Sequence, residues 1–139
     1  MKIVMDTDTI IAALRSPTGA SAELLRRVRR GEVKLMASVS LFMEYEAVAS
    51  RPEHAAAAGL AGDQVEVFLN ALAFLVEPVE VHFLWRPQLR DPADELVLEA
   101  AVNAQADALL TFNLRHFAQA AKKFDLNVLQ PGPFLRSLK

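Results

Sequence analysis

The chain has 139 residues, of which 53% are hydrophobic and 23% charged, with a formal net charge of −2. This length and hydrophobic content suffice for one domain with a buried core, and hardly for two. The sequence contains no cysteine, which excludes a disulfide framework, a thiolate zinc site and catalysis by a cysteine nucleophile.

Short apolar runs alternate with longer segments of helical period, which is typical of an α/β domain with a mostly parallel sheet. The predicted strands are Lys2–Met5, Val33–Ala37, Ala108–Thr111 and Asn127–Leu129. The predicted helices are Thr9–Leu14, Ser21–Arg30, Val39–Ala49, Asp63–Leu75, Pro92–Gln105 and Arg115–Lys123, with a last turn at Pro133–Leu138. The pair Arg51-Pro52 is expected to close the third helix, because the residue before proline avoids the α region. No element is predicted between Glu77 and Pro87.

The charge and the N-terminus bear on partners and location. A net charge of −2 gives no overall attraction to a polyanion, so nucleic-acid binding would need a local basic patch or bound metal. The N-terminal MKIVMD leaves no room for the apolar segment of a signal peptide, and no run of about 20 apolar residues suggests a membrane span. We therefore expect a cytoplasmic protein with no membrane partner.

Asp6 follows the first apolar strand and precedes a helix, so it is placed at the carboxyl end of a strand. Ligands of open α/β sheets bind at that edge. Asp6 could instead be the N-cap of the helix, and Asp8 could cap the same helix. Both interpretations stay open for Asp6, whereas capping is the simpler role for Asp8.

Glu44 is an unusual residue for its position in the third helix. Leu41, Tyr45 and Val48 define the buried stripe of that helix, and Glu44 lies at its edge. A carboxylate on the core side needs a cation, a hydrogen-bond partner or a raised pKa. A metal site would satisfy it, and so would an arginine partner or access to water at the edge of the sheet.

A third group of acids opens a later helix, at Asp91-Pro92-Ala93-Asp94-Glu95. Asp91 fits an N-cap, Pro92 the first helical position, and Asp94 a first turn in which the helix dipole favours negative charge. Capping does not require so many acids in one turn, where like charges repel unless a cation is shared. If these acids meet Asp6 and Glu44, the site suits Mg²⁺ or Mn²⁺ and phosphate chemistry.

The chain resembles the PIN-domain ribonucleases, specifically the VapC-like toxins of toxin-antitoxin pairs. The matching stretches are IVMDTDTIIAALRSPTGA, SVSLFMEYEAVASRP, DPADELVLEAAVNAQADALLTFNLRHF and VLQPGPFL. The resemblance implies a three-layer domain over residues 1–139, with a central, mostly parallel sheet flanked by helices. It also implies that Asp6, Glu44 and Asp94 bind Mg²⁺ or Mn²⁺.

The family's usual fourth acid corresponds to Asn113 here, and Asp8 stands where the family commonly has Asn. An Asn in place of an acidic ligand removes one charge but keeps a carbonyl oxygen. Asn113 is therefore counted with Asp6, Glu44 and Asp94 among the candidate catalytic residues, and Asp8 could return the missing charge. Asn113 and Thr111 could also simply end a strand and cap the next helix, which is the simpler role for Thr111.

The resemblance implies a metal-dependent endoribonuclease that leaves a 3′-hydroxyl and a 5′-phosphate, and a toxin that is silenced by a cognate antitoxin protein. It also implies a homodimer. The helix with Leu41, Phe42, Met43 and Tyr45 is apolar on more than one side, as expected if one face meets the core and another a partner. Alternatively, Phe42 and Met43 pack beneath the segment that follows.

Two other functions remain open. Asp6-Thr7-Asp8-Thr9 also resembles the DxDxT signature of haloacid-dehalogenase-type phosphatases, in which Asp6 would be a covalent nucleophile. That assignment leaves Glu44 unexplained, and no later acidic pair follows a strand. The second alternative is a degenerate PIN domain that acts as a binding module, with its metal site weakened at Asn113.

Basic and aromatic residues offer weaker signals. One side of the second predicted helix is basic, with Arg26, Arg27, Arg29 and Arg30. We expect it to be a solvated face, unless it lies beside the acids, where it could contact phosphate. Arg15 and Lys34 could extend it. The histidines have no metal-ligand spacing and are expected to be surface or structural residues: His54, His82 and His116. Trp85 is expected to pack rather than to stack a base.

Overall fold

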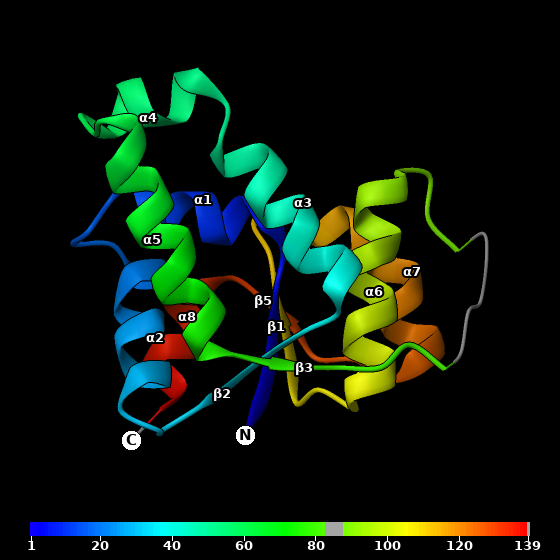
Figure 1. The fold of residues 1–139 in the computed structure, drawn as a ribbon. Coiled ribbons are helices and arrows are strands. Elements are labelled where there is room, and N and C mark those ends of the chain that lie inside the picture. The colour runs from blue at the N-terminus through cyan, green and yellow to red at the C-terminus, as the bar shows by residue number, and fades with distance from the viewer. Residues whose placement is uncertain (83–87, 139) are drawn as a thin grey trace.

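The structure is a computed structural model, and it describes residues 1–82 and 88–138 (Figure 1). The strands are β1 (Lys2–Met5), β2 (Lys34–Ala37), β3 (Val76–Pro78), β4 (Ala108–Leu110) and β5 (Val128–Leu129). The helices are α1 (Thr7–Arg15), α2 (Ala20–Arg29), α3 (Val39–Ala49), α4 (Pro52–Ala58), α5 (Gly62–Leu75), α6 (Pro92–Ala104), α7 (Leu114–Phe124) and α8 (Pro131–Ser137). Trp85 lies outside the described residues.

The strands form one parallel sheet in the order β3-β2-β1-β4-β5. The central strand is β1, in which Ile3 pairs with Leu35 on one side and with Ala108 on the other. Helices cover both faces of the sheet: α2, α5 and α8 lie on one side, and α6 and α7 on the other (Figure 1). Burial on both faces explains why β1 is a continuous apolar run rather than an alternating one. The predicted α/β fold, a central parallel sheet flanked by helices, is confirmed.

The sheet order decides which residues meet at its carboxyl edge. Because β1 and β4 are neighbours and parallel, the segments that follow them leave the sheet side by side. The amide of Asp6 donates to the carbonyl oxygen of Leu110 at 2.8 Å, which continues the ladder one residue beyond β1. Asp6 and Thr111 are thereby brought together across most of the length of the chain.

The prediction that the third helix closes at Arg51-Pro52 is confirmed, since Arg51 is extended, but the helix that begins at Pro52 was not predicted. Helix α3 does end at Ala49, but Pro52 then occupies the first position of α4, where a missing N–H costs nothing. Helix α4 ends at Gly59, whose φ of 70° is a left-handed conformation that suits glycine. No residue of α4 is fully buried, so it has no apolar stripe that the sequence could reveal.

Strand β3 was not predicted either. It consists of three residues, at the edge of the sheet beside β2, with Ala37 paired to Pro78. Proline is tolerated in an edge strand because one side of that strand needs no N–H donor. An element of this kind depends on its distant partner rather than on its own sequence.

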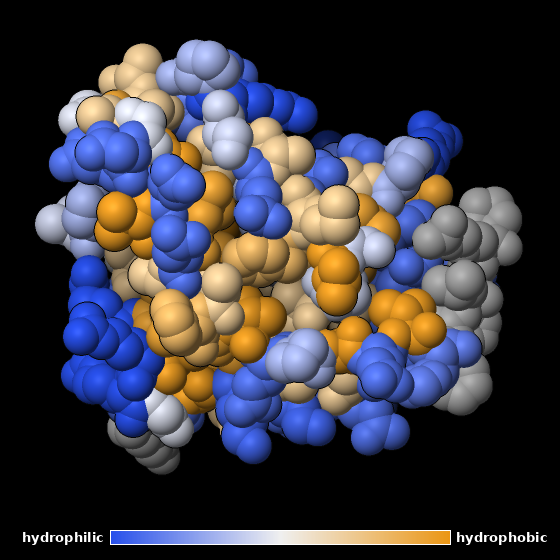
Figure 2. Space-filling view, viewed as in Figure 1, coloured by the Kyte–Doolittle hydropathy of each residue, from blue (hydrophilic) through white to orange (hydrophobic). Residues whose placement is uncertain are grey.

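One face of the molecule exposes apolar side chains. Figure 2 shows them gathered over α3 and α5, and the exposed fraction is 71% for Val39, 61% for Met43 and 92% for Phe74. On the inner side of α3, Leu41 and Tyr45 are fully buried. Helix α3 is therefore apolar on two sides, as predicted, and Met43 is not covered by any described segment.

Among the described helices, none is by itself long and apolar enough to cross a membrane. The consecutive pair α4 and α5, bent by 96°, passes the same test of length and composition.

Candidate active site

Asp6 lies directly after β1, at the carboxyl edge of the sheet, and is 6% exposed. Its Oδ1 accepts a hydrogen bond from the amide of Thr7, at 2.7 Å, which makes Asp6 the N-cap of α1. Its Oδ2 accepts one from the hydroxyl of Thr111, also at 2.7 Å. Asp6 is thus both a cap and a buried carboxylate at the edge where ligands of such sheets bind.

Asp8 lies in the first turn of α1 and faces the turn between β4 and α7. Its Oδ2 accepts hydrogen bonds from the amide of Phe112, at 3.0 Å, and from the side-chain Nδ2 of Asn113, at 3.2 Å. Its Oδ1 is buried and has no hydrogen-bond partner in the described part of the chain. The capping role predicted for Asp8 is wrong, because Asp6 is the N-cap.

The acids that open α6 have separate surroundings. Asp91 is the N-cap and accepts from the amide of Ala93 at 2.9 Å. Glu95 accepts from the amides of Gln88, at 2.6 Å, and Leu89, and so holds the preceding segment against the helix.

Asp94 is the remaining acid of this turn, and it is 8% exposed. Its Oδ2 lies 2.9 Å from Nδ1 of His116, in the first turn of α7. Of the three acids in this turn, Asp91 and Glu95 thus bind backbone amides, and Asp94 is the one that faces the candidate site.

Asp6 and Asp8 both have a raised pKa to which the charge of Asp94 contributes. Burial, then the charge of Asp8 and to a lesser degree that of Asp94, raises the pKa of Asp6 from 3.8 to about 7, although the Thr111 hydroxyl opposes the rise. Burial and the Asp94 charge raise the pKa of Asp8, and burial raises the pKa of Asp94 against the opposing hydrogen bond from His116. No lysine or arginine among the described residues pairs with these carboxylates, and His116 is the one described basic side chain that forms an ion pair with them. A bound cation would favour their ionised forms further.

These residues fit a hard divalent cation in their chemistry. Carboxylate oxygens are the ligands that Mg²⁺ and Mn²⁺ prefer, and the unpartnered Oδ1 of Asp8 has lone pairs available. As the side chains stand, no three His, Asp or Glu of the described ranges are close enough together to form a ready ligand set.

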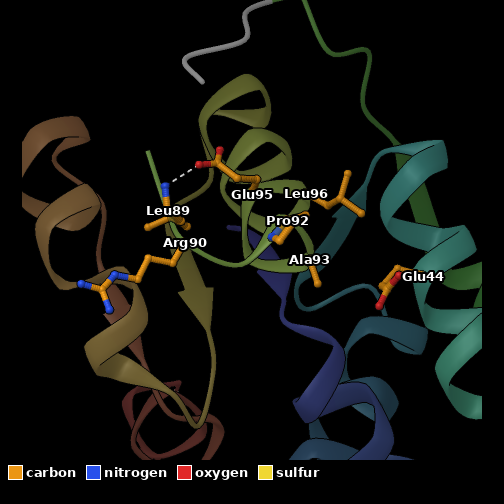
Figure 3. A pocket seen from close by; sticks show the side chains of 7 residues that line it. All are labelled: Glu44, Leu89, Arg90, Pro92, Ala93, Glu95 and Leu96. Atoms are coloured by element: carbon orange, nitrogen blue, oxygen red, sulfur yellow. Dashed lines mark hydrogen bonds between the residues drawn. The ribbon is translucent and has the colours of Figure 1, made fainter. Parts of the chain in front are cut away.

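Glu44 lies apart from this cluster. It is half-buried on α3 and makes no hydrogen bond or ion pair within the described residues. Figure 3 shows it facing the first turn of α6, where it lines a pocket of about 440 Å³ together with Ala93 and Leu96. The neighbouring Tyr45 donates its hydroxyl to the carbonyl oxygen of Met5, which fastens α3 to the end of β1. Glu44 is thus held close to the carboxyl edge without contacting Asp6.

The basic run of α2 does not adjoin the acids. Glu23 pairs with Arg26 at 2.7 Å, with Arg27 at 3.0 Å and with Arg30 at 3.1 Å, as the helical spacing of these residues favours. These arginines occupy the end of α2 that leads into β2, which is the amino edge of the sheet. Lys34, which begins β2, is at the same edge. The condition for phosphate contact beside the acids is therefore not met, and the solvated face that was the simpler interpretation applies.

Residues 2–115 match the family model described as PIN domain, which covers most of the chain. The chain belongs to the PIN domain family. Among solved structures, this PIN domain is similar to a chain of VapBC2 from Rickettsia felis, bound to a DNA fragment from their promoter. The TM-score is 0.63, with 13% sequence identity over 94% of this chain and 98% of the other, which is a likeness of fold. No curated protein matches the sequence.

The structure of this PIN domain brings together the two positions at which the resemblance implied other residues. Asn113 donates its side-chain amide to the carboxylate of Asp8 at 3.2 Å. Sequence reasoning assigned Thr111 and His116 to structural or surface roles, yet they contact Asp6 and Asp94. The one signal for Thr111 was its place at the end of a strand, and His116 had none.

Proposed function

We propose that this PIN domain is a metal-dependent endoribonuclease and the toxin of a toxin-antitoxin pair. The observation that supports it best is the group of Asp6, Asp8 and Asp94 at the carboxyl edge of the sheet. These carboxylates are buried or half-buried, the charges of Asp8 and Asp94 raise the pKa of Asp6, and one oxygen of Asp8 has no hydrogen-bond partner among the described residues. A cation removes the repulsion between such acids, and a phosphodiester supplies further oxygen ligands to the cation.

The chain's own residues would prepare this site as follows. Asp6, Glu44 and Asp94 would hold Mg²⁺ or Mn²⁺, and Asn113 would contribute its amide oxygen. Thr111 fixes Asp6 through its hydroxyl, and His116 positions the Asp94 carboxylate. The chemistry supplied by such a cation is neutralisation of charge on the phosphate and activation of water for in-line attack.

Asp8 is the acid that we add to the predicted set. Its carboxylate lies against Asn113, at the position where the family's fourth acid would bring its charge. We infer that Asp8 restores the charge that Asn113 lacks, so the acid count of the site stays that of the family. This inference argues against a degenerate binding module.

The test is incubation of the purified protein with labelled single-stranded RNA, with and without Mn²⁺ or Mg²⁺. Wild type should cut the RNA only with metal, and leave a 3′-hydroxyl and a 5′-phosphate. Asp6→Asn and Glu44→Gln should lose most of this activity, whereas Asp63→Asn, an exposed acid in the first turn of α5, should keep it. If wild type binds RNA in the presence of metal but does not cleave it, the proposal is contradicted and the alternative of a binding module is favoured.

The phosphatase alternative is tested separately. A haloacid-dehalogenase-type Asp6 would form an aspartyl-phosphate, whereas the proposed nuclease forms no covalent intermediate. Intact-protein mass spectrometry after incubation with a phosphate donor distinguishes the two chemistries, and a phosphoryl adduct on Asp6 would overturn the nuclease proposal.

The partner part of the proposal rests on the exposed apolar face. Val39, Phe42 and Met43 of α3 line a groove of about 350 Å³ against the end of α5 and the edge strand β3. Apolar surface of this kind marks a protein interface, and the similar fold is a chain of a VapBC complex. We propose that the chain forms a homodimer and binds an antitoxin.

Both partners can be tested. A monomer by light scattering at high micromolar concentration would reject the dimer. Unimpaired growth of cells that express the chain alone would contradict the toxin role without touching the nuclease.

A further inference from the structure

A second feature of the carboxyl edge is a groove that runs along α1, away from the acids. One wall is the face of α1 from Asp8 to Arg15, and the other is formed by the end of α3 and the start of α4, with Arg51 and His54. Figure 1 shows α4 above α1 with α3 beside them. The volume of the groove is about 590 Å³. It begins at Asp8, so it is continuous with the acid cluster.

The arginines of this groove have no charged partner among residues 1–82 and 88–138. Arg15 and Arg51 are exposed, and neither makes an ion pair or side-chain hydrogen bond to any described residue. By contrast, Glu23 pairs with three arginines of α2. His54 also lines the groove, and its Nδ1 is buried without a hydrogen-bond partner in the part of the chain that the structure describes. Unpaired guanidinium groups beside a site for phosphate chemistry are suited to bind further phosphates.

The dimensions of the groove favour a chain of phosphates over a single anion. Asp8 and Arg15 are two helical turns apart, about 10 Å along the axis of α1. Ile11 and Val48 line the groove between its charged ends, and they offer an apolar surface to sugars or bases. An extended strand that enters the acid cluster would pass from Asp8 to Arg15 along this surface.

We propose that the α1 groove binds the phosphates of an RNA strand on one side of the cleaved bond, with Arg15 and Arg51 as the phosphate contacts. This inference rests on the proposed nuclease function and specifies how a protein with a net charge of −2 holds its substrate. Contacts of this kind position the strand without reading its sequence. His54 completes the groove as a hydrogen-bonding group.

The test is RNA binding measured by fluorescence anisotropy, with a chelator present so that no cleavage occurs. The variant is Arg15→Gln with Arg51→Gln, and the control is Arg29→Gln with Arg136→Gln. The control removes the same charge from exposed residues of α2 and α8. Binding by wild type should weaken with salt, and the groove variant should lower the slope of log K against log salt by about 1.4, because each phosphate contact on a single strand contributes about 0.7. The control should keep the wild-type slope.

The outcomes separate this inference from the nuclease proposal. A wild-type slope in the groove variant, or no RNA binding by wild type, would overturn the groove assignment even if the protein cleaves RNA. Tighter binding of duplex DNA than of RNA through the same arginines would also overturn it. Arginine-dependent RNA binding without metal-dependent cleavage would support the groove and reject the nuclease.

Discussion

Replacing Asp6 by Asn is expected to stabilise the metal-free protein at neutral and alkaline pH. The pKa of Asp6 is about 7 in the folded chain against an ordinary value of 3.8, because it is buried beside Asp8 and Asp94. A group with a raised pKa binds its proton more tightly in the folded state. Its contribution to stability is therefore complete below about pH 4 and is lost as the pH rises through about 7. By linkage, this difference in pKa lowers the free energy of unfolding by about 4 kcal/mol at pH 8.

The substitution also removes one hydrogen bond. Asn keeps a carbonyl oxygen for the amide of Thr7, but its NH₂ group cannot accept from the hydroxyl of Thr111, which costs about 1 kcal/mol. The expected net gain in the free energy of unfolding is about 3 kcal/mol at pH 8, or roughly 10 °C in Tm for a domain of this size. At pH 4 the gain disappears.

The assay is thermal or urea unfolding from pH 4 to pH 9, with a chelator present. Wild type should lose stability between these limits, and Asp6→Asn should lose much less. The control Asp63→Asn, an exposed acid in the first turn of α5, should follow wild type. An Asn variant that is no more stable than wild type at pH 8 would refute the reasoning, because burial would then impose no penalty on the Asp6 charge.

Three further predictions concern the neighbours of Asp6. Asp8→Asn and Asn113→Asp should each lower metal-dependent RNA cleavage about tenfold, as typical for groups that support metal ligands, and the double variant should recover most of the loss. If the losses of activity in the two single variants simply add in the double variant, the contact between Asp8 and Asn113 does not determine the activity. Thr111→Val should lower the free energy of unfolding by about 1–3 kcal/mol. Because the Thr111 hydroxyl lowers the pKa of Asp6, the pH profile of cleavage should move to higher pH. Tyr45→Phe should also lose about 1–3 kcal/mol in urea unfolding, since a buried carbonyl at the end of β1 loses its partner, but its pH profile should stay that of wild type.

Elements whose sequence contains their own periodicity could be predicted. Helix α3 was predicted with its observed bounds from the stripe of Leu41, Tyr45 and Val48, of which the first two are buried and Val48 is half-buried. Elements that depend on distant partners could not. The edge strand at Val76–Pro78 forms only through its pairing with β2. The exposed helix Pro52–Ala58 has no buried stripe from which the sequence could predict it.

The sequence by itself determined the fold class and the place of Asp6, since an apolar run followed by an acid puts that acid at the end of a buried strand. Only the tertiary structure decided which other groups surround it. Thr111 is 105 residues away in the chain and reaches Asp6 because β4 lies beside β1. Asp94 is near Asp6 because α6 packs against β1, and Asp8 because it lies in the helical turn that Asp6 caps. Glu95, adjacent in sequence to Asp94, instead accepts hydrogen bonds from backbone amides. Periodicity indicates which face of an element is buried, but the contacts between carboxylates depend on the order of the strands and the packing of helices upon them.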